Sequence, residues 1–411
     1  MTVDVELSPD TERDDDRDEV AEGNLHVLLL RLSGTLQDGL LTGLRDWLAE
    51  GRRAEVAQAV AFEAVSQPLQ LAADEIGLLR VELLRGGGDP ELALALEELR
   101  GERAPTPWQF LSALPDGEDD PDLVTRPLDR TAEPLANLDP VERALVAEAA
   151  GLPGVRALWQ AWRMPPPARP WQQPVRVAVV SVDDAVAAMP ALAVRLRRVM
   201  ADAGDPDAQV EVCWPGLDVP FYQTSARTCG ALLWASRPAV PITTARVFDG
   251  VDPVRGPWFT TNRPVIAEGV ERDRLLDALR SAVVITWSSA AMTDVLSPER
   301  GDVVPLHLRT DGCWVWSDAS TYYLENYGLA PDPELTAYLS GSAPGEPLDE
   351  ISVHRVLVHL FAGTSGEAVW RPPDPEPDAD AADPTAASNP WRSKDPPAVD
   401  PWAGAEDPVP T

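Results

Sequence analysis

The segment from Val303 to Leu339 constrains the fold more than any other part of this 411-residue chain. It contains Asp311-Gly312, a dipeptide that favours a two-residue hairpin turn, because a type I′ turn needs positive φ at both central positions. Successive side chains on each flanking strand would point to opposite sides of the sheet. The sequence therefore predicts a β-hairpin in which Thr310 pairs with Cys313.

The predicted hairpin has one apolar side and one aromatic side. The apolar side carries Leu306, Leu308, Cys313 and Val315, and the aromatic side carries His307, Arg309, Trp314 and Trp316. Arg309 would lie opposite Trp314, which suits a cation–π contact of roughly 0.5–1 kcal/mol. Either a helix covers the aromatic side, or this side is an exposed surface that binds a partner. In the second case, Trp316→Ala should weaken partner binding by roughly 2 kcal/mol or more.

Helix signals follow the hairpin directly. Ser317 or Asp318 can cap the start of one helix, and Gly328 suits the left-handed position at its end. Asp332 and Pro333 match the start of a second helix. Earlier in the chain, the segment 139–142 reads Asp-Pro-Val-Glu, which predicts a helix that starts with a capping box.

The rest of the chain predicts an all-α domain followed by an α/β domain with a mixed sheet. Val155, Leu158, Trp159 and Trp162 recur at helical spacing, whereas the β-branched run from Val175 predicts a buried strand. We expect the following divisions: a disordered acidic N-terminus at 1–22, a helical domain at 23–164 with an irregular acidic insertion near 104–138, a proline linker at 165–174, the α/β domain at 175–370, and a disordered tail rich in Pro and Asp at 371–411.

Two similar elements stand out in the tail. Residues 389–392 read Asn-Pro-Trp-Arg and residues 400–403 read Asp-Pro-Trp-Ala. A tryptophan side chain contributes little to the solubility of a polar tail, so Trp391 and Trp402 are candidate protein-binding residues in short docking motifs. The alternative is that both occur by chance in a chain that contains 14 tryptophans.

Charge and composition exclude several classes of function. A net charge of −33 disfavours nucleic acid, which needs a basic surface, and favours a protein partner, possibly a basic one. The chain has no run of 18 apolar residues and its N-terminus is acidic, so we expect neither a membrane span nor a signal peptide. Three widely spaced cysteines fit a reducing compartment. We expect a cytoplasmic protein, while secretion without a conventional signal peptide stays open.

Motifs that would indicate catalysis are missing from the sequence. His354 and His359 are five residues apart on an expected helix and so do not share a face, and the predicted pairing puts Cys313 and His307 on opposite sides. We therefore expect no metal, no cofactor and no catalytic residues, and a non-enzymatic protein that binds another protein. The competing class is a small-molecule hydrolase or transferase that uses the crevice at the strand ends of the α/β domain.

Three segments carry a resemblance to a known group of proteins. They read FTTNRPV at 259–265, RTDGCWVWSDASTYYL at 309–324 and GLAPDPEL at 328–335, and RALWQAWR at 156–163 is consistent with them. About half of the chain resembles uncharacterised actinobacterial proteins found near type VII secretion and polymorphic-toxin genes. The resemblance implies a secretion-accessory, chaperone-like or immunity-type binding protein. No tyrosine has an acidic residue four positions later, so the secretion signal of that pathway is absent.

Overall fold

The computed structural model describes residues 9–104, 108–114, 126–166, 172–183, 188–252, 254–341 and 348–362, with side chains from residue 18 onward. The chain divides into two compact units. The first unit comprises residues up to 243 together with 310–315 and 344–365, and the second comprises 244–309 and 316–343. None of the described helices is long and apolar enough to cross a lipid bilayer.

The first unit begins with a bundle of helices that has its own apolar core. The bundle consists of α1 (Pro9–Leu32), α2 (Asp38–Ala49), α3 (Arg53–Ser66), α4 (Ala73–Arg85), α5 (Pro90–Ala95) and the 3₁₀ helix η1 (Leu96–Leu99). Leucines at helical spacing, such as Leu41, Leu44 and Leu48, are buried between these helices. The helical region that the sequence predicts is thus confirmed.

The start of α1 corrects one prediction. We expected disorder throughout residues 1–22, but α1 begins at Pro9, so residues 9–22 continue the helix that carries the buried leucines. An established helix adds further turns more easily than a new helix starts, and acidic residues are favourable near a helix N-terminus. Residues 1–8 and the whole of the predicted disordered tail, 371–411, lie outside the described residues.

A mixed sheet of six strands forms the centre of the first unit. Its strands are β1 (Phe110–Leu111), β2 (Leu128–Asp129), β3 (Val155–Arg163), β4 (Val175–Val182), β5 (Gln209–Cys213) and β6 (Ala231–Ala235). The strand order is β2-β6-β3-β4-β5, and β1 pairs with β3. The strand β3 runs antiparallel to β4 and to β6, whereas β4 and β5 are parallel.

The strand β3 corrects two further predictions. Residues 155–163 form a central strand rather than the helix that their apolar spacing suggested. This strand pairs with β4 from Val155↔Val182 to Arg163↔Val175, so the segment 165–174 joins two neighbouring strands of one sheet. The predicted domain boundary at 165–174 is therefore wrong. The α/β region starts earlier, because β1 and β2 lie in the insertion that was predicted to be irregular.

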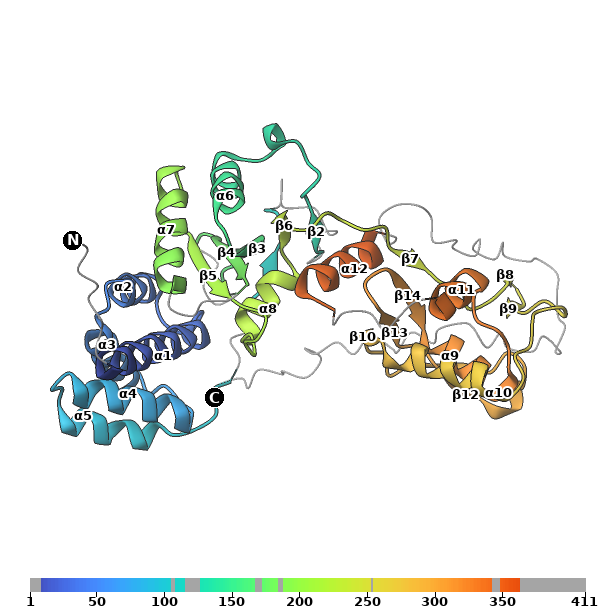
Figure 1. The fold of residues 1–411 in the computed structure, drawn as a ribbon, viewed down its shortest axis with the longest axis horizontal. Coiled ribbons are helices and arrows are strands. Elements are labelled where there is room, and N and C mark those ends of the chain that lie inside the picture. Colours follow the sequence, from blue (N-terminus) through green and yellow to red (C-terminus); the bar gives the residue numbers. More distant parts are fainter. Residues whose placement is uncertain are drawn as a thin grey trace, which may run out of the picture. The chain divides into compact units, whose positions relative to one another are not determined.

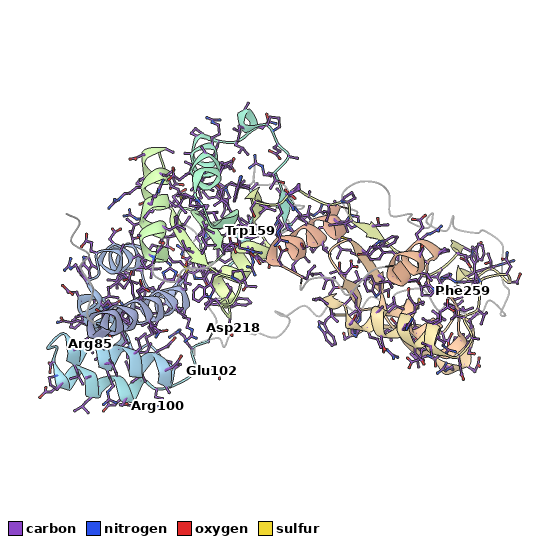
Figure 2. All side chains as sticks on the ribbon, in the orientation of Figure 1. Arg85, Arg100, Glu102, Trp159, Asp218 and Phe259 are labelled. Carbon is purple, nitrogen blue, oxygen red and sulfur yellow. The ribbon has the colours of Figure 1, made fainter. Side chains whose placement is uncertain are left out.

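Helices cover both faces of this sheet, as Figure 1 shows. One face packs against α6 (Pro140–Gly151) and α7 (Met189–Asp202), and the other packs against α8 (Phe221–Thr228) and the start of α12 (Glu350–Ala362). Trp159, labelled in Figure 2, is buried on the α8 face, and Leu158 is buried on the opposite face. Ala157, Leu158 and Trp159 are consecutive, apolar and buried, because both faces of β3 are covered.

The helical bundle contacts the sheet through polar groups at β5. Arg45 on α2 forms a 2.7 Å ion pair with Glu211 on β5, and both side chains are buried. Ser33 and Gln223 donate hydrogen bonds to the same carboxylate oxygen, at 2.9 and 2.8 Å. His26 Nε2 on α1 donates to the Val212 carbonyl at 2.8 Å. A buried hydrogen-bonded network therefore connects the apolar core of the bundle to that of the sheet.

Acidification should destabilise this junction through His26. Burial lowers the pKa of His26 from its ordinary value of 6.5 to about 4, so the unfolded chain takes up a proton more readily than the folded chain as the pH falls. The stabilisation is complete above pH 6.5 and is lost as the pH falls towards 4. We expect a loss of about 2–3 kcal/mol at about pH 4.5, measurable by urea unfolding.

His26→Gln is the control for this measurement, because its amide can still donate to the Val212 carbonyl but does not titrate. Carboxylates titrate in both proteins, so the difference between the two pH profiles isolates the histidine. Parallel profiles between about pH 7 and about pH 4.5 would contradict the assignment.

The second unit is built from short strands and helices. Its elements are β7 (Thr243–Thr244), β8 (Gly250–Asp252), β9 (Gly256–Trp258), α9 (Val270–Ser281), β10 (Val283–Thr286), β11 (Ala291–Thr293), η4 (Pro298–Arg300), β12 (Asp302–Pro305), β13 (Leu308–Thr310), β14 (Trp314–Ser317), α10 (Asp318–Tyr327) and α11 (Pro333–Gly341), although β7, β13 and β14 each include residues assigned to the first unit. Phe259, labelled in Figure 2, contacts the buried Tyr323 ring at a centroid distance of 4.8 Å. The predicted fold class, a helical region followed by an α/β region with mixed sheets, is confirmed.

Candidate functional site

The predicted hairpin forms, but its turn differs from the prediction. The strands β13 and β14 are joined by the three residues Asp311, Gly312 and Cys313 rather than by a two-residue turn. Asp311 Oδ1 accepts hydrogen bonds from the backbone N–H groups of Cys313 and Trp314, at 3.0 and 2.8 Å. Gly312 has a φ of 94°, which a residue with a Cβ rarely adopts. The aspartate therefore holds a longer loop, and the predicted pairing of Thr310 with Cys313 does not form.

Trp316 does not belong to an exposed aromatic surface. Its side chain is only 1% exposed, and its indole Nε1 donates a hydrogen bond to the Leu279 carbonyl on α9 at 3.2 Å. Its neighbour Val315 is also buried. Consecutive buried residues show that both faces of β14 are covered at Val315 and Trp316, which agrees with the first of the two alternatives that the sequence left open. The interpretation of Trp316 as an accessible anchor is therefore wrong.

Arg309 is also engaged differently from the prediction. Its Nε donates to Asp318 Oδ1 at 2.6 Å, and its Nη1 donates to the carbonyl oxygens of Arg280 and Ala282 at 2.8 and 2.9 Å. These bonds fix α9 and the start of β10 to the N-terminus of α10. Trp314 is half-buried. The guanidinium of Arg309 thus stabilises the packing of the second unit.

His307 is the one predicted residue that lies beside an exposed aromatic ring. Its imidazole contacts the indole of Trp287 at a centroid distance of 4.5 Å. Its Nδ1 accepts a hydrogen bond from the backbone N–H of Ser288 at 3.1 Å. Trp287 itself is 80% exposed. The histidine therefore supports an indole that faces solvent and that was not among the predicted residues.

Trp287 directly follows β10, an edge strand that lacks the charged residues and prolines that commonly oppose pairing with further strands. The strand β10 lies at one end of the order β10-β13-β14-β7, and no charged residue or proline occurs between Ser281 and Thr293. Natural edge strands generally carry lysine, proline or a bulge, because unpaired backbone N–H and C=O groups attract further strands. Val283 at the start of β10 is also exposed. We call β10 with Trp287 and His307 the β10 edge.

Sequence reasoning missed Trp287 as a functional candidate. The available signal was an uncharged β-branched segment that ends in tryptophan. The other two predicted residues, Trp391 and Trp402, lie outside the described residues.

Polar residues at the carboxyl ends of β4 and β5 form the strongest candidate for catalysis. Ser181 and Cys213 are register partners at this edge of the sheet. Ser181 Oγ donates to Glu350 Oε1 at 2.6 Å, and Arg156 Nε donates to the same oxygen at 3.1 Å. Burial, with a further contribution from the Glu211 charge, raises the pKa of Cys213 to about 12. The thiol therefore stays protonated at neutral pH, and Ser181 shares the Glu350 oxygen with the Arg156 guanidinium.

Histidine and acidic groups elsewhere have structural partners. His354 Nε2 donates to the Leu128 carbonyl at 2.9 Å, and burial lowers the pKa of this histidine. Asp294 is buried and accepts hydrogen bonds from the hydroxyl groups of Tyr322 and Tyr327. Within the described ranges, no three His, Cys, Asp or Glu side chains are grouped so that they could hold a metal ion.

Comparison with protein-family models, with curated proteins and with solved structures found no match for this chain.

Proposed function

We propose that this protein acts by binding another protein and that the β10 edge is its binding surface. The observation that carries the proposal is an uncharged, β-branched edge strand that is directly followed by an 80% exposed tryptophan. Exposed edge strands bind extended segments by adding a strand to the sheet, with main-chain hydrogen bonds supplying affinity. Tryptophan is enriched among the residues that dominate binding energy at protein interfaces.

The expected occupant is an extended segment of a different protein. A net charge of −33 opposes close approach of a second copy of this chain, whereas a neutral or basic partner would be attracted. Val283 and Trp287 lie four residues apart, the spacing that places side chains on the same face of an extended segment. Side chains on one face of the added strand would pack on these two residues. Specificity for such a partner would come from apolar residues at alternate positions of its bound segment.

The biological setting of this binding is also a proposal. The resemblance of residues 259–265, 309–324 and 328–335 to actinobacterial proteins near type VII secretion and polymorphic-toxin genes favours a secretion-accessory, chaperone-like or immunity-type role. Some chaperones of exported subunits act by strand addition, and an edge strand as the binding surface fits this mode. A cytoplasmic location fits such a role.

Trp287→Ala should weaken binding of the partner by about 2 kcal/mol, which corresponds to a roughly 30-fold higher Kd. Val283→Lys should weaken it similarly, because lysine on an edge strand opposes strand addition. The partner would first be captured from the native host with the wild-type chain and identified by mass spectrometry. Titration of the purified partner against each variant would then give the two Kd values.

Trp258→Ala is the matched control, since Trp258 is also an exposed tryptophan of the second unit but lies on β9. It should leave the Kd unchanged. If all three variants bind equally well, or if only Trp258→Ala loses binding, the β10 edge is not the binding surface.

A further inference from the structure

A groove between α1 and α4 in the first unit is separate from the β10 edge. It encloses about 560 Å³ and is lined by Val20 and Ala21 on α1 and by Gly77, Leu78 and Val81 on α4. Val20 and Val81 are 63% and 54% exposed, so large apolar side chains of two packed helices face solvent at the same place. A volume of this size accommodates a side chain as large as an indole together with its neighbours.

Charged groups around the groove are mainly acidic. Asp74 and Glu82 line it from α4, and Asp18, Glu19 and Glu22 lie on the adjoining part of α1. Three arginines pair with carboxylates here, namely Arg31 with Asp74 at 2.9 Å, Arg53 with Asp18 at 2.6 Å, and Arg85, labelled in Figure 2, with Glu82 at 3.3 Å, so the five acidic side chains remain in excess. Across residues 18–104, acidic residues outnumber arginines two to one. An apolar side chain flanked by cations would therefore complement this groove.

One segment of the C-terminal part of the chain has this chemistry. Trp391 is followed by Arg392 and by Lys394, which is the only lysine of the whole chain. The other Pro-Trp element places Trp402 between Asp400 and Glu406, without a nearby cation. The two elements thus share a tryptophan after proline but differ in flanking charge.

The chain is also long enough for this segment to reach the groove. The last described residue, Ala362, belongs to the first unit, as does the groove. Residues 363–390 can span up to roughly 90 Å, whereas a compact unit of this size has a radius of gyration of roughly 18 Å. Contact within one molecule therefore needs no second copy of the chain.

We propose that residues 389–394 of the tail dock in the groove between α1 and α4 of the same chain. The Trp391 indole fills the apolar groove between Val20 and Val81, and the Arg392 and Lys394 cations face the carboxylates of Asp74 and of the acidic part of α1. The segment covers apolar surface that the bundle otherwise leaves open to solvent. Because the tether keeps the effective concentration of the segment high, modest intrinsic affinity suffices to keep the groove occupied.

The single lysine provides a sharp test on the full-length protein. A water-soluble carbodiimide condenses an amine with a nearby carboxylate and leaves an amide that mass spectrometry locates. With dilute monomer, we expect intramolecular links from Lys394 to Asp74, Glu22, Glu19 or Asp18. Trp391→Ala and Val81→Glu should each reduce these links at least five-fold.

Two matched controls separate docking from general effects. Trp402→Ala removes the tryptophan of the acidic element, and Leu94→Glu adds a charge at an exposed apolar position of α5 that does not line the groove. Neither should change the yield of the links, and circular dichroism confirms that each variant is folded. The proposal is overturned if Lys394 links only to other tail residues, only between molecules, or to the same extent in Trp391→Ala as in the wild type.

Discussion

Arg45→Met should lower the free energy of unfolding of the first unit by about 3–5 kcal/mol. Arg45 forms the ion pair with Glu211, which is fully buried on β5. Removing the cation leaves a carboxylate in the interior with only neutral hydrogen-bond donors, Ser33 and Gln223. Breaking a buried pair by removing one partner is costly because the remaining charge is uncompensated. Denaturant unfolding, followed by far-UV circular dichroism, measures the loss.

The double variant Arg45→Met with Glu211→Leu tests the cause. Replacing both members of a buried ion pair by apolar residues is often close to neutral, so most of the stability should return. Arg52→Met is a surface control, because Arg52 pairs with Glu55 on an exposed part of α3 and should change stability by less than about 1 kcal/mol. If the double variant is as unstable as the single one, lost packing rather than uncompensated charge explains the effect.

Trp316→Ala should destabilise the second unit by about 3–5 kcal/mol, the range typical of large buried aromatic residues. The substitution removes a 1% exposed indole and leaves the Leu279 carbonyl without its 3.2 Å donor. From the sequence, this substitution was expected to weaken partner binding, with the fold intact, only if the aromatic side were exposed. The structure buries Trp316, so we expect a loss of stability, which thermal unfolding of the variant measures.

Trp287→Ala is the matched comparison, since it removes a tryptophan of the same unit that is 80% exposed. It should change stability by less than about 1 kcal/mol, because little apolar surface is lost from the interior. A larger loss of stability for Trp287→Ala than for Trp316→Ala would contradict the burial that we describe.

Local signals in the sequence determined where several elements begin and end. Asp139 accepts hydrogen bonds from the N–H groups of Val141 and Glu142, and Glu142 completes the predicted capping box of α6. Ser317 caps α10, and Gly328 ends it with a φ of 69°. These features depend on a few neighbouring residues and on backbone groups that need partners at helix ends, so sequence alone suffices to predict them.

Tertiary structure decided the features that depend on what covers a residue. The spacing of Val155, Leu158, Trp159 and Trp162 fits a helix, yet both faces of β3 are covered, and a strand buried on both faces loses its alternation. Trp316 lies on β14 and Trp287 directly follows β10, but Trp316 is buried against α9 whereas Trp287 is exposed. The spacing of apolar residues reflects local backbone geometry, whereas the burial of a side chain depends on residues that are far away in the sequence.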